Sequence, residues 1–179
     1  SQQRAARASA EGRLAAEITP VPAAEARRRE DFTADEQPRA DTSLEKLAAL
    51  KPIVSSEGTV TAGNASGLND GACALLIASE VAIERHGLRP LARILGAASA
   101  GVAPRTMGIG PVPAMRKLLG RLQLQLDDFD RIEVNEAFAA QVLACTRTLG
   151  LADDESRLNP HGGAIALGHP LGASGARLL

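Results

Sequence analysis

The chain has 179 residues, of which 45% are hydrophobic and 23% are charged, a balance typical of a soluble globular protein with room for little more than one domain. The net charge of -1 gives no electrostatic reason to expect nucleic acid or an anionic membrane as a partner. The longest apolar run, residues 72–78, is far shorter than the roughly 20 residues that cross a bilayer. No secretory signal is visible, and Cys73 and Cys145 form no C-x-x-C pair, so we expect a cytoplasmic protein without disulfides.

The first 58 residues form a distinct, charge-rich region. The Ala-, Arg- and Glu-rich stretch 2–14 predicts a helix, and prolines at 20, 22 and 38 disfavour a long helix in the rest of the region. The cluster Arg27-Arg28-Arg29 favours a solvated face over a phosphate site. Thr42-Ser43-Leu44-Glu45 has the spacing of a capping box and predicts the start of a short helix.

From Thr59 onward the pattern alternates between apolar strands and helices. The expected strands or extended segments are 72–78, 92–100, 131–134 and 158–167. The expected helices are one that ends near His86 before Gly87, 111–121, 137–149, and one that starts at Ser174. This alternation predicts an α/β layered domain with functional groups in the loops at strand ends.

Three polar, glycine-bearing segments interrupt this framework. The first, 61–71, has the Gly, Asn and Ser density that lets backbone N–H groups approach a ligand, although a turn cluster is at least as good an interpretation. The second begins with Asn135-Glu136 directly after a predicted strand. There an amide could orient a water or donate to an oxyanion, but local chemistry alone favours a helix cap.

The third segment, 161–175, holds His169 between Gly168 and Pro170. This setting suits a rigidly placed imidazole for proton transfer, and a structural histidine is an equally good interpretation. The run lacks G-K-[ST] and a G-x-G-x-x-G after a strand, so nucleoside triphosphate hydrolysis is unsupported.

Taken in order, VTAGNASGLNDGA (60–72), MGIGPVPA (107–114), NEAFAAQ (135–141) and GGAIALGHPLGASGAR (162–177) resemble the signature series of the thiolase family. The resemblance covers essentially the whole chain, and GAASAGVAPRTMGIGPV leans toward the β-ketoadipyl-CoA branch. It implies a layered α-β-α-β-α fold of two similar halves with an inserted loop domain. Residues 1–60 would be a loop-domain portion, 61–88 the end of the N-terminal half and 89–179 a truncated C-terminal half.

The resemblance also implies an activity, namely acyl transfer between coenzyme A thioesters by 3-oxoacyl-CoA thiolysis or the reverse condensation. It implies coenzyme A and acyl-CoA as substrates and partners, no prosthetic group, no metal, and a homo-oligomer for the complete enzyme. His169 matches the histidine that activates the nucleophile and lends an oxyanion donor, and Asn135 matches the asparagine that holds a catalytic water. The matched ligand contacts are Ser66 and Ala62 at the pantetheine arm, Phe138 at the tunnel, Met107 beside the acyl site and Arg39 near the adenine.

Neither family cysteine segment is matched in this chain. Cys73, expected in a strand, and Cys145, expected in a helix, match neither catalytic position and are predicted to be core residues. We therefore expect a thiolase fragment that is inactive alone. Two alternatives remain, a non-catalytic acyl-CoA- or lipid-binding thiolase-like remnant and a ketoacyl synthase, and NEAFA with GHP disfavours the second.

Overall fold

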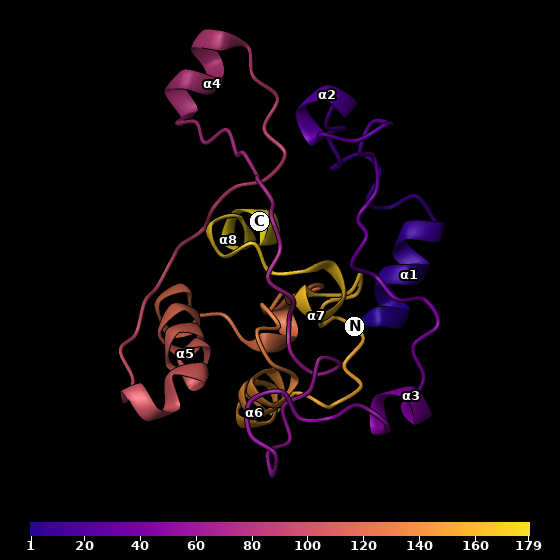
Figure 1. Cartoon of the computed structure of the whole chain (residues 1–179). Helices are drawn as coiled ribbons and strands as arrows, with labels where there is room; N and C mark the ends of the chain where they lie inside the picture. Colours follow the sequence, from indigo (N-terminus) through magenta and orange to yellow (C-terminus); the bar gives the residue numbers. More distant parts are fainter.

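The computed structural model describes all residues 1–179, and helices carry its regular structure (Figure 1). In chain order these are α1 (Gln2–Ala10), α2 (Ala23–Ala26), α3 (Leu44–Ala48), α4 (Glu80–His86), the 3-10 helix η1 (Pro104–Ile109), α5 (Pro111–Leu122), the 3-10 helix η2 (Leu126–Asp128), α6 (Ala139–Thr148), α7 (Ala164–Leu167) and α8 (Leu171–Leu178).

Local signals place several of these helices as predicted. At α4, the Ser79 hydroxyl accepts a hydrogen bond from the Ala82 N–H at 3.2 Å, and Gly87 ends the helix with φ of 59°. A left-handed residue at this position stops a helix, and glycine adopts it without strain. α5 starts at Pro111, where the missing N–H costs nothing. In α3 the capping residue is Ser43, one position after the residue that the capping-box spacing indicated.

The predicted strands 72–78 and 92–100 are wrong as paired strands. Both segments run extended, but none of their backbone N–H groups donates a hydrogen bond. Figure 1 shows them as two arms that carry α4 away from the other helices. A strand needs a neighbour to complete its ladder, and nothing in this chain lies in that position. Leu76 is therefore 84% exposed, and Cys73, predicted to be buried, is exposed as well.

The core lies between α6 and the segment 131–134. Ile132, Val134, Val142 and Leu151 form one buried cluster. The predicted strand 131–134 is reduced to one parallel bridge between Ile132 and Leu158.

The helix boundaries near the C-terminus also differ from expectation. α6 begins at Ala139, and residues 164–167, predicted to be extended, form the turn of helix α7. α8 begins at Leu171, three residues earlier than expected, with Pro170 as its N-cap residue. Cys145 is buried in α6, as predicted.

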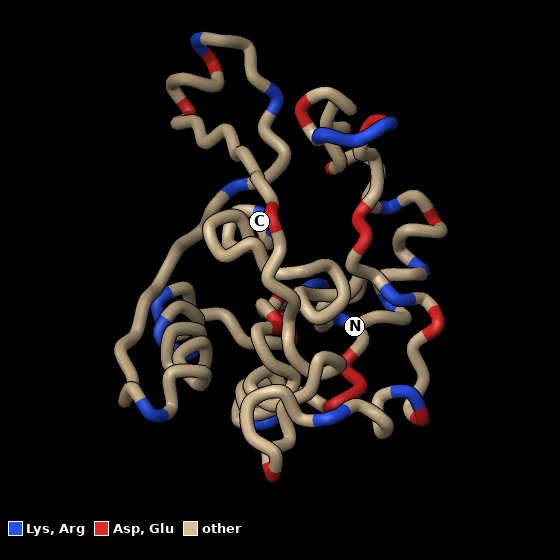
Figure 2. Tube along the Cα trace, in the orientation of Figure 1, with Lys and Arg blue, Asp and Glu red and all other residues tan.

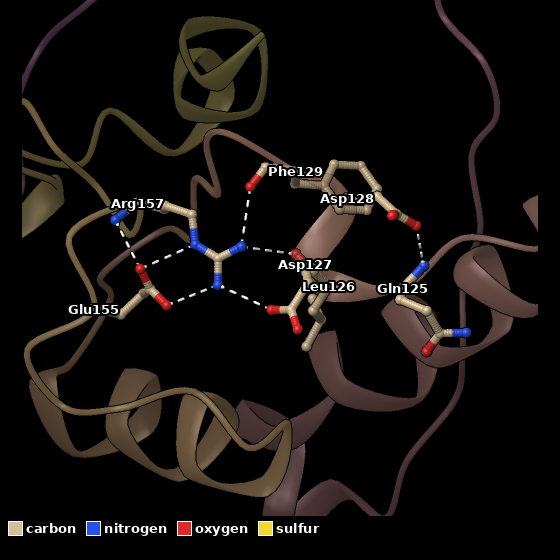
Figure 3. Close-up of polar contacts among 7 residues, drawn as sticks. All are labelled: Gln125, Leu126, Asp127, Asp128, Phe129, Glu155 and Arg157. Carbon is tan, nitrogen blue, oxygen red and sulfur yellow. Dashed lines mark hydrogen bonds and ion pairs between the residues drawn. The ribbon is translucent and has the colours of Figure 1, made fainter.

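A side-chain clamp holds the connection into the core (Figure 3). The Arg157 guanidinium donates to the carbonyls of Leu126 at 3.0 Å and Phe129 at 3.1 Å, and it pairs with Glu155 at 2.8 Å. The hydrogen bonds from Arg157 lower the pKa of Glu155 to about 2. The clamp thus ties η2 to the segment that leads toward Asn159.

Charge is spread unevenly along the chain (Figure 2). The segment 59–79 contains Asp70 as its single charged residue. Arg27, Arg28 and Arg29 are exposed, and the Arg28 guanidinium lies 4.9 Å from the centre of the Phe32 ring, which confirms the solvated face. None of the helices combines the length and the apolar character that crossing a bilayer requires.

Candidate functional site

The three polar segments of the sequence meet in space. The His169 N–H donates to the Gly67 carbonyl at 3.1 Å, which joins the first segment to the third. The Ala139 N–H donates to the Asn64 carbonyl at 2.8 Å, and the Ser66 N–H donates to the Ala137 carbonyl at 3.0 Å. These bonds join the first segment to the second, so residues about 70 and 100 positions apart form one site.

Asn135 and His169 face each other at this junction. The Asn135 Nδ2 lies 3.3 Å from the His169 Nε2, and both side chains are half-buried. The helix-cap interpretation of Asn135 is wrong, because α6 starts at Ala139 with Phe138 as its N-cap residue. The Asn135 Oδ1 is buried and has no hydrogen-bond partner within the chain. Asn135 therefore has a free acceptor beside the imidazole.

The backbone before Asn135 is held by the side chain of Asn159. The Val134 N–H donates to Asn159 Oδ1 at 2.8 Å, and Asn159 Nδ2 donates to the Val134 carbonyl at 2.8 Å. A strand neighbour would make the same pair of bonds. Asn159 is 2% exposed and has φ of 42°, a left-handed conformation that asparagine tolerates.

Glu136 links Asn135 to the segment that carries His169. Its Oε1 accepts from Asn159 Nδ2 at 3.0 Å, and its Oε2 accepts from the Ile165 N–H at 3.1 Å and from the Ser1 hydroxyl at 2.6 Å. The carboxylate packs so tightly on Gly163 that a Cβ there would lie 2.4 Å from Glu136 Cδ. Sequence reasoning weighed Glu136 only as a helix-terminus residue and missed this role. The groups that donate hydrogen bonds to Glu136 belong to Ser1, Asn159 and Ile165, which are far from it in the sequence.

The His169 ring is fixed from the opposite side. Gly168 has φ of 89°, which favours glycine, and a Cβ there would meet the Asn69 side chain at 2.4 Å. The His169 Nδ1 lies 2.6 Å from the Ser174 hydroxyl in α8, and Ser174 is 3% exposed. Sequence reasoning missed Ser174. The one signal for it was its place one helical turn after Pro170, where its side chain folds back toward the preceding histidine.

The remaining predicted residues surround this pair less closely. Ser66 is half-buried in the first segment, and Ala62 is exposed at its start. Phe138 is 44% exposed at the start of α6, and Met107 is 77% exposed on η1, which packs against α6. Arg39 is exposed, and its backbone N–H donates to Gln2 Oε1 at 2.7 Å, which ties the Arg39 backbone to α1.

Comparison with known proteins assigns this arrangement to a family. The model of the thiolase N-terminal domain matches residues 1–81, and that of the thiolase C-terminal domain matches residues 88–179. The chain belongs to the thiolase family. This confirms the resemblance carried by the four sequence segments.

Individual thiolases are similar over the whole chain. The β-ketoadipyl-CoA thiolase of Pseudomonas aeruginosa is 64% identical over all 179 residues, and the 3-oxoadipyl-CoA/3-oxo-5,6-dehydrosuberyl-CoA thiolase of Escherichia coli is 55% identical over 99% of the chain. The crystal structure of the Bacillus anthracis acetyl-CoA acetyltransferase superposes with a TM-score of 0.92 at 48% identity over 99% of the chain. The predicted thiolase fold is thus confirmed. The chain spans 45% of the length of each of these three proteins.

Proposed function

We propose that this chain forms part of an acyltransferase that acts on coenzyme A thioesters, with β-ketoadipyl-CoA as the substrate cleaved by free coenzyme A. The observation that carries this proposal is the Asn135–His169 pair, with an Nδ2 to Nε2 distance of 3.3 Å. Relatives support the substrate. The Pseudomonas aeruginosa protein is named a β-ketoadipyl-CoA thiolase, and one similar structure is the human mitochondrial 3-ketoacyl-CoA thiolase in complex with CoA.

In this proposal His169 acts on the proton of a nucleophilic thiol. A neutral imidazole accepts that proton, and the resulting imidazolium donates to the oxygen that becomes negative when the thioester is attacked. Asn135 holds a water at the same oxygen, and its Oδ1 has the free acceptor capacity for this role. A buried amide oxygen without a partner costs about 1–3 kcal/mol, which a bound water removes.

The residues proposed to contact the ligand have polar groups or apolar surface that no other part of the chain occupies. The Ser66 hydroxyl makes no hydrogen bond within the chain, so it is free to contact the pantetheine arm. Phe138 and Met107 expose apolar surface for the tunnel and the acyl group. Ala62 and Arg39 are exposed and complete the proposed set at the pantetheine and the adenine.

We further propose that neither cysteine of this chain is the nucleophile. Burial raises the pKa of the Cys145 thiol, which donates to the Gly108 carbonyl at 3.2 Å. A thiol in this state is a poor nucleophile, because the thiolate is the reactive form. Cys73 is exposed in the segment 72–78. The isolated chain is therefore proposed to be inactive. We also propose a cytoplasmic location and a homo-oligomeric complete enzyme. The proposed domain boundaries lie after residues 60 and 88.

A chimera tests this proposal directly. These 179 residues replace the matching part of the Pseudomonas aeruginosa relative, and thiolysis of β-ketoadipyl-CoA and acetoacetyl-CoA is measured. The expected result is turnover that His169→Ala removes and that prefers β-ketoadipyl-CoA. A folded chimera that binds coenzyme A without turnover would instead favour the non-catalytic acyl-CoA-binding alternative. Activity of the isolated chain that Cys73→Ala abolishes would overturn the assignment of the nucleophile.

A further inference from the structure

The Ser174 hydroxyl, which carries a single proton, contacts two polar atoms. Its Oγ lies 2.6 Å from the His169 Nδ1 and 3.1 Å from the Pro170 carbonyl oxygen. The side chain is 3% exposed, so water does not compete for either contact. The proton of Ser174 can serve only one of them, and this choice decides which ring nitrogen of His169 carries a hydrogen.

One arrangement satisfies all three polar contacts around the ring. If the Ser174 hydroxyl donates to the Pro170 carbonyl, a common bond to the carbonyl four residues earlier in a helix, its lone pair accepts from an Nδ1–H of His169. The Nε2 then carries a lone pair, and it faces the Asn135 Nδ2, which is a donor. Three hydrogen bonds form in this arrangement.

The opposite arrangement leaves donors facing each other. If Ser174 donates to Nδ1, the ring hydrogen moves to Nε2 and points at the N–H of Asn135 Nδ2. The Asn135 amide would have to turn over, and the Pro170 contact would lose its proton, so at most two bonds remain. Leaving a buried polar group without a partner is unfavourable, so the first arrangement, with three hydrogen bonds, is favoured.

We infer that Ser174 is a positioning residue that holds His169 in the Nδ1–H tautomer, with the Nε2 lone pair directed into the site. The inference rests on the proposed role of His169 as a base, for which Nε2 must be free to accept a proton. Ser174 touches no reacting atom. It acts by fixing where the imidazole carries its hydrogen and how the ring is turned.

Nitrogen NMR of the chain labelled with ¹⁵N-histidine tests the inference without catalysis. Long-range ¹H–¹⁵N correlations recorded at mildly alkaline pH distinguish a ring nitrogen that bears hydrogen from one that does not. The expected wild-type pattern has hydrogen on Nδ1 and a pyridine-type signal from Nε2. Ser174→Ala is expected to shift the ring toward the Nε2–H tautomer, and Ser174→Thr, which keeps the hydroxyl, is expected to retain the wild-type pattern.

The experiment has controls in the same chain and outcomes that would contradict the inference. His86 and His161 should keep their signals in every variant, and Ser9→Ala, which removes an exposed hydroxyl from α1, should change nothing. A wild-type ring with hydrogen on Nε2 would overturn the inference even if Ser174→Ala did not fold. An unchanged His169 pattern in a folded Ser174→Ala variant would overturn it as well. Failure of the chimera as an acyltransferase would leave these spectra unaffected, so the two proposals fail separately.

Discussion

At the scale of single residues, the Asn159 side chain makes the hydrogen bonds to Val134 that a neighbouring strand would otherwise make. Its side-chain amide makes both backbone hydrogen bonds of Val134 and a third to Glu136, all inside the core. One side chain therefore holds the peptide that leads into Asn135. Because these groups are buried, water cannot replace the bonds if the amide is lost.

We expect Asn159→Ala to lower the free energy of unfolding by about 3 kcal/mol, because an unpaired buried polar group costs about 1–3 kcal/mol and three groups lose a partner. Urea denaturation with the midpoint followed by far-ultraviolet circular dichroism measures this change. The matched control is Asn64→Ala, whose side chain is half-buried and bonds near the surface. That variant should cost less than about 1 kcal/mol. Equal urea midpoints for the two variants would show that the buried Asn159 amide contributes no more to stability than the Asn64 amide.

The catalytic pair is tested by single substitutions in the chimera with the Pseudomonas aeruginosa relative. His169→Ala should lower kcat by a larger factor than it raises KM. Asn135→Ala should have a milder effect, with kcat lowered by about 100-fold or more, as for the loss of one oxyanion donor. Ser66→Ala should chiefly raise the KM for coenzyme A, because it lies away from the reacting carbon. Steady-state kinetics of the three variants decide the roles. Near-normal kcat in His169→Ala would mean that His169 is structural.

At the scale of elements, the clamp of Arg157 makes the connection around η2 sensitive to acid. The Glu155 side chain is 15% exposed and pairs with a guanidinium that also donates to two carbonyls. Protonating Glu155 removes the charge that orients Arg157 (Figure 3). The segment between η2 and the core then loses its polar tie.

The sign of the pH effect is set by the lowered pKa of Glu155, which is about 2 in the folded chain against an ordinary 4.5. A carboxyl with a lowered folded-state pKa stabilises fully above the ordinary value, and this contribution is lost as the pH falls toward the folded value. We expect stability to fall between about pH 4.5 and pH 2, and Glu155→Gln to remove that part of the dependence. Urea midpoints across this range measure it. Glu57→Gln, which removes an exposed carboxylate with no ion-pair partner, should leave the slope unchanged.

Sequence alone predicted the helices better than the strands, for a physical reason. The ends of α4 and α5 depend on residues beside them, such as Ser79, Gly87 and Pro111. Strands depend on partners far away in the chain, so the apolar segments 72–78 and 92–100 signalled a structure that these residues cannot complete.

The candidate site divides in the same way. Asn135 and His169 were identified because the residues around them carry a recognisable pattern, and the structure places them in contact. Ser174, Glu136 and Asn159 act through contacts that no spacing rule gives, so only the folded arrangement reveals them.

At the scale of the whole molecule, the chain buries little of itself. Its solvent-accessible surface is 12938 Å² for 18.5 kDa, whereas a compact globular protein of this mass exposes roughly 8,200 Å². Only 20 of 179 residues are buried. Most of the stabilising apolar contact is therefore confined to the region between α6, α7 and the segment 131–134.

Hydrogen exchange should divide the chain accordingly. Amides in 72–78 and 92–100 have no hydrogen-bond acceptor and should exchange nearly as fast as in an unfolded peptide. The amides of Val134 and Ile165, both bonded inside the core, should be the slowest. Exchange followed by mass spectrometry or NMR gives the protection of each segment. Strong protection in the two arms would mean that they pair with something, such as a second copy.

The arm at 72–78 also governs how the chain behaves when it is concentrated. Ala72 to Ala78 contains no charge, no proline and no glycine, and it stands extended with an open row of backbone donors and acceptors. Identical segments with these properties stack on one another as cross-β sheets, each completing the hydrogen bonds of the next. The same seven residues that fail to find a partner within one molecule can therefore find it in another. An exposed segment of this kind is therefore a site of self-association, which grows as the chain is concentrated.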